Sequence, residues 1–159
     1  LINRVLSFAQ RTYGSVPTLG EITEAERSVF EAIERCARET GLSIERCEFK
    51  KAFKEIFILA QTGNQYVNAQ APWKLVKENP QRANTVMHTA IKLCQALTIF
   101  LEPFVPMTAH AAWTMMGFTE EISSGSWDHF GGELPAHQKL GPVSPLIKRI
   151  ERENAVAGL

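Results

Sequence analysis

The sequence predicts an all-α protein, an antiparallel helix bundle with an irregular glycine- and proline-rich segment before its last helix. Apolar residues recur with the ~3.6-residue period of amphipathic helices along most of the chain, and no stretch alternates long enough to indicate a strand. Glycines crowd into residues 117–143. We therefore expect one domain over residues 1–159, with the bundle at 1–116 and the last helix at 144–156, where Pro145 suits a first turn.

The first two expected helices have recognisable ends. Residues 1–13 follow a helical pattern that Gly14 ends, because glycine tolerates the left-handed conformation of a helix C-terminus. Thr23 and Glu26 form the capping-box pattern that opens the second helix, and its apolar period runs to Gly41. The chain opens in the middle of a helical pattern, so we expect it to be a fragment of a longer protein.

The middle of the chain predicts a long helix, a short helix and a central helix. The long one, about residues 47–69, contains Gly63, whose cost of about 1 kcal/mol relative to alanine indicates either close packing or a local bend. Pro72 opens the short helix. The next helix, about residues 81–101, is apolar nearly all round in its second half, which is typical of a buried central helix. A further helix follows at about 107–116.

Composition narrows the class of function. Lys+Arg and Asp+Glu balance at 17 each, which argues against binding nucleic acid by bulk charge but not against reading it through a few stacking and hydrogen-bonding groups. Three cysteines without a CxxC pair indicate reduced thiols. No apolar stretch reaches the ~20 residues of a membrane span. We expect a cytoplasmic protein without a signal peptide or membrane segment.

No pattern indicates catalysis or a metal site. The four histidines lie far apart, and none pairs with Glu or His at helical spacing. No cysteine or histidine spacing matches zinc. The glycines at 131–132 lack the strand–turn–helix context of a phosphate loop. We therefore expect no catalytic residue, metal or cofactor within the chain.

Two features are candidates for contact with nucleic acid. Trp73 follows Pro72 at a corner between helices, where an indole can stack on an unpaired base for ~1–3 kcal/mol. Composition alone favours the alternative that Trp73 closes the end of the bundle. Arg4, Ser7 and Arg11 share one stripe of the first helix, and arginine can hydrogen-bond base edges. A solvated helix face is the ordinary alternative for this stripe.

Residues 63–75, Gly-Asn-Gln-Tyr-Val-Asn-Ala-Gln-Ala-Pro-Trp-Lys-Leu, resemble a motif of the methionyl-tRNA synthetase family. Three further stretches resemble the same family in the same order: residues 3–8 its opening helix, 101–106 its L-x-P-F-x-P turn and 145–151 its P-L-F-x-R-I-E ending. The resemblance covers nearly the whole chain. It implies the helical anticodon-binding domain that accompanies a class I catalytic domain.

The resemblance implies that the chain receives the CAU anticodon loop of methionine tRNAs. Trp73 would stack on the wobble cytosine, with Pro72 beside it, and Arg4 would hydrogen-bond that base. Asn3 and Asn64 lie in the same motifs and are further candidates for anticodon contact.

Two positions depart from the family. Some members carry acidic residues at or near Gln61 and Asn68 that help to repel wrong anticodons. These two positions are also anticodon-binding candidates, and selection here would depend more on fit than on repulsion.

The resemblance also implies what the chain lacks. The H-x-G-H-like and K-M-S-K-S-like catalytic signatures are absent, so the fragment itself would be non-catalytic. The parent would join methionine to its tRNA with ATP and Mg, and with zinc as a further candidate, in the catalytic domain of the same chain. Two alternatives stay open: the equivalent domain of a class I synthetase for Cys, Leu, Ile or Val, and a non-catalytic paralogue that acts as an interaction module. The oligomeric state is not predicted.

Overall fold

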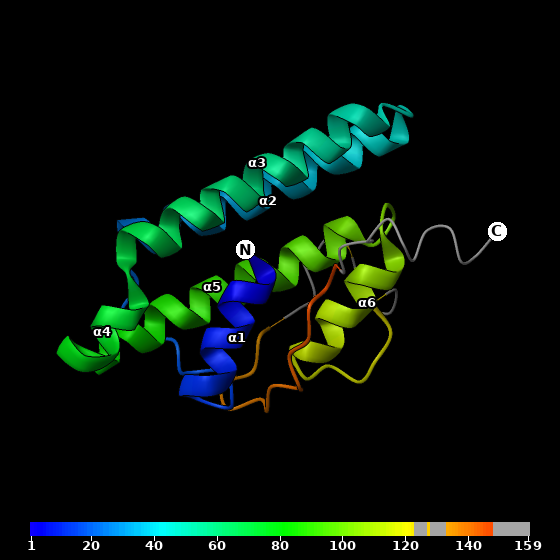
Figure 1. Ribbon diagram of the computed structural model, residues 1–159. Helices are drawn as coiled ribbons and strands as arrows, with labels where there is room; N and C mark the ends of the chain where they lie inside the picture. The colour runs from blue at the N-terminus through cyan, green and yellow to red at the C-terminus, as the bar shows by residue number, and fades with distance from the viewer. Residues whose placement is uncertain (123–126, 128–132, 148–159) are drawn as a thin grey trace, which may run out of the picture.

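The computed structural model describes residues 1–122, 127 and 133–147. Within these residues the fold is all-α, as predicted, and no strand occurs beyond one isolated bridge between Ser15 and Lys139. The helices in chain order are α1 (Ile2–Thr12), α2 (Glu24–Glu45), α3 (Phe49–Gln70), α4 (Pro72–Glu78), α5 (Pro80–Leu101) and α6 (Pro106–Met115). Figure 1 shows α2 and α3 as a long hairpin on one side of α5, with α1 and α6 on the other.

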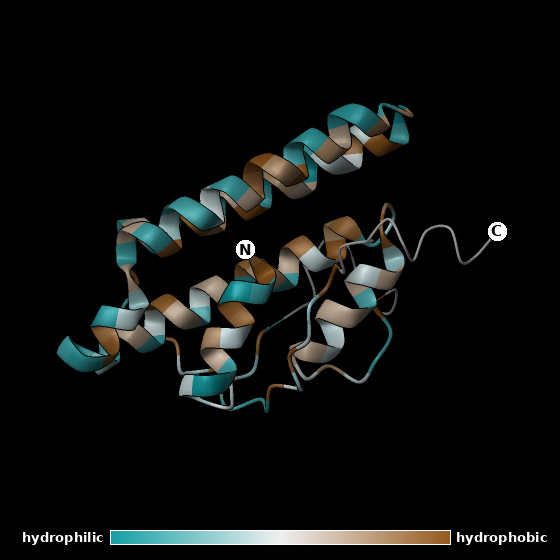
Figure 2. Ribbon diagram, viewed as in Figure 1, coloured by the Kyte–Doolittle hydropathy of each residue, from teal (hydrophilic) through white to brown (hydrophobic). Residues whose placement is uncertain are grey.

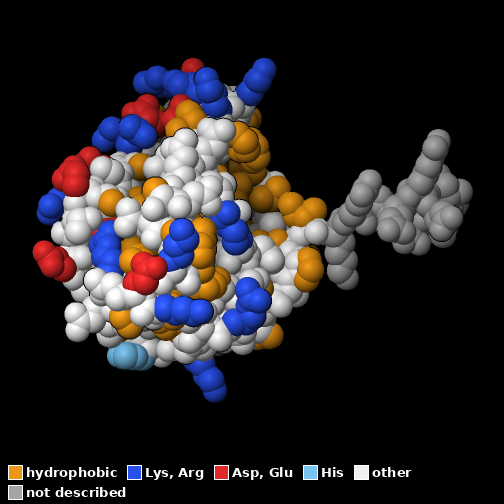
Figure 3. Space-filling view, turned by 60° about the vertical axis from the view of Figure 1, so that its left-hand side comes forward, with side chains coloured by type: hydrophobic (Ala, Val, Ile, Leu, Met, Phe, Trp, Pro, Cys, Tyr) orange, Lys and Arg blue, Asp and Glu red, His pale blue; other side chains and the backbone are white. Residues whose placement is uncertain are grey.

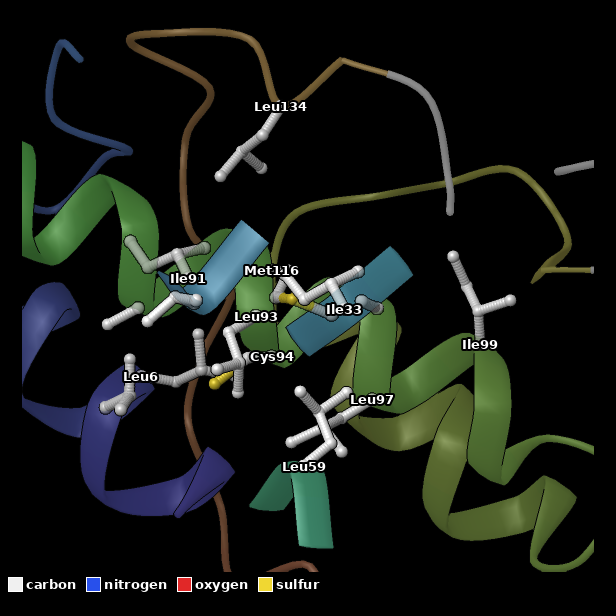
Figure 4. Close-up of a cluster of buried hydrophobic side chains, with 14 of the residues drawn as sticks. Leu6, Ile33, Leu59, Ile91, Leu93, Cys94, Leu97, Ile99, Met116 and Leu134 are labelled. Atoms are coloured by element: carbon white, nitrogen blue, oxygen red, sulfur yellow. The ribbon is translucent and has the colours of Figure 1, made fainter. Parts of the chain in front are cut away.

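Helix α5 is the centre of the bundle, as its apolar second half predicts. It packs against each of the other described helices, and in its second half the residues from Leu93 to Phe100 are all buried. Figure 4 shows Leu93 and Leu97 of α5 among side chains from α1, α2 and α3. Figure 2 shows the upper edge of the α2–α3 hairpin, which faces away from α5, as mainly hydrophilic. Burial of each large apolar side chain stabilises such a core by about 1.5–3 kcal/mol.

The expected end of the second helix at Gly41 is wrong. Helix α2 continues to Glu45, and the chain turns at Cys47, which adopts a positive φ of 57°. A side chain at position 41 would meet Trp127, since a Cβ there would lie 3.3 Å from the indole nitrogen. That nitrogen donates to the carbonyl of Ala37 over 3.2 Å. The glycine therefore serves the approach of an indole rather than the end of a helix.

Gly63 permits close packing, and α3 is continuous through it. A Cβ at this position would lie 2.6 Å from Leu1 Cδ2 and 2.8 Å from Leu93 Cδ2. Of the two possibilities that the sequence left open, close contact with α1's start and α5 is the one observed.

The expected start of the last helix is also wrong. Residues 144–147 are not helical. The carbonyl of Ser144 accepts a hydrogen bond of 2.6 Å from Asn3 Nδ2, and Leu146 packs against the core. These tertiary contacts outweigh the local preference of Pro145 for a first turn. The remainder of the expected 144–156 helix lies outside the described residues.

A buried carboxylate ties α2 to α3 and α5. Glu26 is fully buried and accepts from the Thr23 backbone amide over 2.9 Å, which confirms the Glu26 half of the predicted capping box. It also accepts from Tyr66 Oη over 2.6 Å and from both terminal nitrogens of Arg82 over 2.7 Å. Arg82 Nη2 further donates to Gln70 Oε1 over 2.8 Å. We refer to Thr23, Glu26, Tyr66, Gln70 and Arg82 as the Glu26 cluster.

These hydrogen bonds keep Glu26 ionised. Burial raises the pKa of a carboxyl group, but the bonds from Arg82, Tyr66 and Thr23 outweigh it and lower the pKa of Glu26 to about 2. A group whose pKa is lowered on folding stabilises the protein above its unfolded pKa, and this contribution is lost as the pH falls through the folded value. The window for Glu26 therefore runs from about pH 5 down to about pH 2.

Replacement of Glu26 by glutamine should lower the free energy of unfolding by about 3 kcal/mol at neutral pH, because the Arg82 charge loses its buried partner. The difference from wild type should narrow as the pH falls from about 5 to about 2. Urea unfolding at a series of pH values measures both effects.

Glu24→Gln is the matched control, because Glu24 pairs with Arg27 on the surface with its side chain 82% exposed. Its effect should stay below about 0.5 kcal/mol. Equal losses in the two variants would contradict a special contribution from the buried carboxylate.

Candidate nucleic-acid interface

The corner between α3 and α4 is built around Ala71. This residue closes α3 and opens α4 with a left-handed backbone, φ 44° and ψ 58°, and its amide still donates to the Val67 carbonyl over 3.0 Å. Non-glycine residues rarely adopt this conformation, and such strain is concentrated at functional sites. Pro72 then begins α4, as the sequence predicts, and Trp73 follows on the surface.

A pocket of about 280 Å³ lies between α1 and this corner. We call it the α1–α4 pocket. Four helices line it, with Arg4, Val5, Phe8 and Arg11 from α1, Val67 from α3, Pro72 and Trp73 from α4, and Met87 from α5. Its walls combine buried apolar residues with exposed cationic ones. Figure 3 shows basic side chains beside hydrophobic ones on the face that includes this end of the bundle. Such a pocket suits a small planar group that carries or neighbours negative charge.

The two arginines of the pocket are held by uncharged groups. Arg4 donates from Nη1 to Asn68 Oδ1 over 3.1 Å and from Nη2 to Asn64 Oδ1 over 3.2 Å. Arg11 Nε donates to the backbone carbonyl of Ser7 over 3.2 Å. Among the described residues, neither arginine takes part in an ion pair. Both positive charges are therefore available to a ligand.

Trp73 lies at the rim of this pocket and does not close the end of the bundle. Its side chain is 44% exposed, whereas Trp113 is 6% exposed and stacks on Phe118 with 4.0 Å between the ring centroids. Trp73 is therefore not a core residue, whereas Trp113 in α6 is. An exposed indole next to two cations has the geometry of a base-stacking platform.

The other candidate residues lie in different places. Asn64 and Asn68 are outside the pocket lining and accept hydrogen bonds from Arg4. Asn3 does not line the pocket and instead bonds to Ser144. Gln61 is exposed on α3, one turn before Asn64, and also lies outside the pocket lining.

The sequence did not single out four lining residues. Val5, Phe8, Val67 and Met87 are apolar residues in helical phase, so their pattern is the same as that of any core residue. Only the way α1 packs against α3 and α5 distinguishes them. Arg11 could be recognised on the Arg4 stripe, but nothing local indicated that it reaches the same pocket.

Metal-binding groups and the two buried thiols were the remaining candidates for chemistry among the described residues. It contains no group of three or more His, Cys, Asp or Glu side chains placed to hold a metal ion. Burial raises the pKa of the Cys36 thiol to about 11 and that of Cys94 to about 12, which keeps both thiols protonated. None of the helices in the described ranges has the length and apolar character to cross a bilayer.

A second hollow of about 500 Å³ has a different character. It lies between α3, the end of α5 and residues 145–147, and Phe53 and Phe57 are among its apolar walls. No lysine or arginine lines it. Because it has no cation to meet a phosphate, we do not assign nucleic-acid binding to this groove.

Comparison with known proteins is consistent across sequence and structure. A family model described as the anticodon binding domain of methionyl tRNA ligase matches residues 16–157. The methionine–tRNA ligase of Thermococcus kodakarensis is 34% identical over 94% of this chain and 20% of its own length. That of Thermobifida fusca is 34% identical over 84% of this chain and 23% of its own. The chain thus spans about a fifth of these relatives.

Solved structures share the fold. The free methionyl-tRNA synthetase of Mycobacterium tuberculosis matches with a TM-score of 0.87 at 19% identity, over 94% of this chain and 31% of that one. The same enzyme bound by methionyl-adenylate matches with a TM-score of 0.84, over 91% of this chain and 29% of that one. At this identity the likeness supports the fold alone.

Trp73→Ala should change the free energy of unfolding by about 1 kcal/mol or less, because nearly half of the indole already faces solvent. Trp113→Ala is the matched comparison and should lose about 3–5 kcal/mol, since it empties a buried site. Thermal and urea unfolding of the two variants measure the difference. A loss at Trp73 as large as that at Trp113 would show that Trp73 belongs to the core.

Proposed function

The chain belongs to the family of methionyl-tRNA ligase anticodon-binding domains, and we propose that it recognises the CAU anticodon of methionine tRNAs at the α1–α4 pocket. One observation carries this proposal: Arg4, near the start of the chain, lines the same small pocket as Pro72 and Trp73. Anticodon bases are unpaired and can be splayed out, which is the form in which proteins read RNA sequence.

In this pocket, different residues supply the affinity for a base and the selection of cytosine. Stacking of a base on Trp73 contributes ~1–3 kcal/mol and tolerates any base. Arg4 supplies the choice, because a guanidinium only donates hydrogen bonds. Cytosine offers two adjacent acceptors, O2 and N3, on its pairing edge. Uracil places an N–H at N3, which faces the guanidinium donor to donor, so the wobble cytosine is preferred.

Arg11 completes the pocket as a contact for the RNA backbone. It lies two turns along α1 from Arg4, a separation of about 10 Å, and its terminal nitrogens have no bonded carboxylate among the described residues. The chain carries no net charge. Attraction to phosphate therefore depends on a few local cations, and binding should depend only modestly on salt.

The chain acts as part of a larger enzyme. We propose that the parent joins methionine to its tRNA in the cytoplasm, using ATP and Mg, with zinc as a further candidate. These groups belong to a catalytic domain of the same polypeptide, outside this chain, and that domain is the chain's second partner. The fragment itself contributes tRNA recognition and no catalytic residue. The family membership removes the alternative of a synthetase for Cys, Leu, Ile or Val. The alternative of a non-catalytic interaction module predicts no binding to the anticodon stem-loop, so a measurement of RNA binding distinguishes it from the proposed function.

Tryptophan fluorescence of the chain should be quenched on addition of a methionine-tRNA anticodon stem-loop. Changing the wobble cytosine to uracil should weaken binding about tenfold or more, since one edge contact contributes ~1–3 kcal/mol. Trp73→Phe should remove most of the quenching, because Trp113 and Trp127 pack within the bundle. Anisotropy of labelled RNA checks that this variant still binds.

Equal affinity for all loops would mean that the pocket does not read the anticodon. Substantial binding to a protein partner, with no binding to the CAU stem-loop at low salt, would favour the interaction module.

A further inference from the structure

The corner that presents Trp73 depends on the backbone of one residue. Ala71 is the only residue between α3 and α4, so its φ of 44° and ψ of 58° set the direction in which α4 leaves α3. Pro72 and Trp73, the first two residues of α4, line the α1–α4 pocket. We propose that Gln70 is the positioning residue for this corner: through its hydrogen bond to Arg82 it keeps Ala71 left-handed and Trp73 at the pocket. This inference rests on the proposed function.

Local preferences oppose this backbone conformation. An alanine in the left-handed region is disfavoured because its Cβ approaches the following carbonyl oxygen, and the penalty corresponds to a factor of about ten in population. A residue that precedes proline also favours an extended backbone, with negative φ. Ala71 meets both conditions, since it is not a glycine and Pro72 follows it. Contacts with other parts of the chain must therefore maintain the turn.

Helix α4 itself supplies little of this restraint. It has seven residues, and Pro72 is its one buried residue. Trp73 is largely exposed and contributes little packing of its own. The restraint must therefore come from residues on either side of α4.

Gln70 connects the corner to the buried carboxylate of Glu26. Its Oε1 accepts from Arg82 Nη2 over 2.8 Å, and Arg82 donates to Glu26 from both terminal nitrogens over 2.7 Å. Gln70 directly precedes Ala71, and Arg82 lies in the first turn of α5. The Gln70–Arg82 bond thus joins the two ends of the segment that contains the corner and α4. A different backbone at Ala71 would redirect α4 and separate Gln70 from Arg82.

Gln70 can be removed without dismantling the rest of the Glu26 cluster. The hydrogen bonds that Glu26 accepts from Thr23, Tyr66 and Arg82 do not involve the Gln70 side chain. Gln70→Ala should therefore release the corner while α2, α3 and α5 stay joined.

The test without RNA is fluorine NMR of the chain labelled with 5-fluorotryptophan, with the Trp73 signal assigned from Trp73→Phe. Gln70→Ala should shift and broaden the Trp73 signal, because the indole then samples several orientations, and should leave the Trp113 signal in place. Gln65→Ala is the matched control and should leave both signals in place, because Gln65 is exposed on the same helix, outside the Glu26 cluster. An unchanged Trp73 signal in Gln70→Ala would overturn the inference. A shift of the Trp113 signal as well would also overturn it, since the effect would then be on the whole fold.

Affinity for the CAU stem-loop, measured by anisotropy of labelled RNA, tests the backbone step. Gln70→Ala should weaken binding about tenfold, the factor by which alanine disfavours the left-handed conformation. Glycine adopts positive φ about as readily as negative φ, so in an Ala71→Gly background the same change should weaken binding less than about threefold. Equal losses in the two backgrounds would contradict the inference, because Gln70 would then act by a route other than the conformation at position 71.

The two measurements distinguish failure of this inference from failure of the proposed function. If Gln70→Ala changes the Trp73 signal but the wild-type chain binds no stem-loop, the proposed function fails and the positioning stands. If the wild-type chain binds the stem-loop and Gln70→Ala changes neither the Trp73 signal nor the affinity, the positioning fails and the proposed function stands.

Discussion

The buried carboxylate of Glu26 is the interaction on which the shape of the binding end depends. It holds Tyr66, near the end of α3, and Arg82, near the start of α5, against α2. Between these two residues the chain makes the Ala71 turn and α4. A helix of seven residues is too short to be stable by itself, since isolated helices need ~12–15 residues. The Glu26 cluster fixes both ends of this segment and so places Trp73. Removal of one partner of a buried ion pair is costly, but the intact pair adds little stability over apolar residues of the same volume, so its main contribution here is to position these helices.

In the proposed recognition, one side chain of the α1–α4 pocket holds the base and another selects it. Trp73 offers an apolar face of constant shape, and Arg4 offers a directional donor. Asn64 and Asn68 accept hydrogen bonds from Arg4, and Tyr66 donates one to Glu26, so in both places an uncharged side chain of α3 contacts a charged group from another helix. In the Glu26 cluster the charges are paired, because burial separates the carboxylate of Glu26 from solvent and an unpaired buried charge is costly. At the exposed pocket the cation has no paired carboxylate among the described residues, which suits contact with RNA.

Local signals could be predicted from the sequence, and contacts between distant segments could not. Glu26 is recognisable as a capping residue because its partner is three residues away, but nothing local indicates that Arg82 completes the cluster. Gly41 has the sequence pattern of a helix end, and only the structure shows that it makes room for the indole of Trp127. In the candidate site, the family resemblance predicts Arg4, whereas its contact with Asn68 depends on how α1 packs on α3. Apolar periodicity predicts the central helix correctly because burial on all sides leaves a direct trace in composition.

The most direct test of the central claim is fluorine NMR of a CAU stem-loop that carries 5-fluorocytosine at the wobble position. If the wobble base stacks on the indole of Trp73, its fluorine signal should shift upfield on binding, through the ring current, and Trp73→Leu should remove that shift in the bound complex. A stem-loop that binds with its wobble fluorine signal unchanged would contradict the account, because the base would then lie outside the α1–α4 pocket.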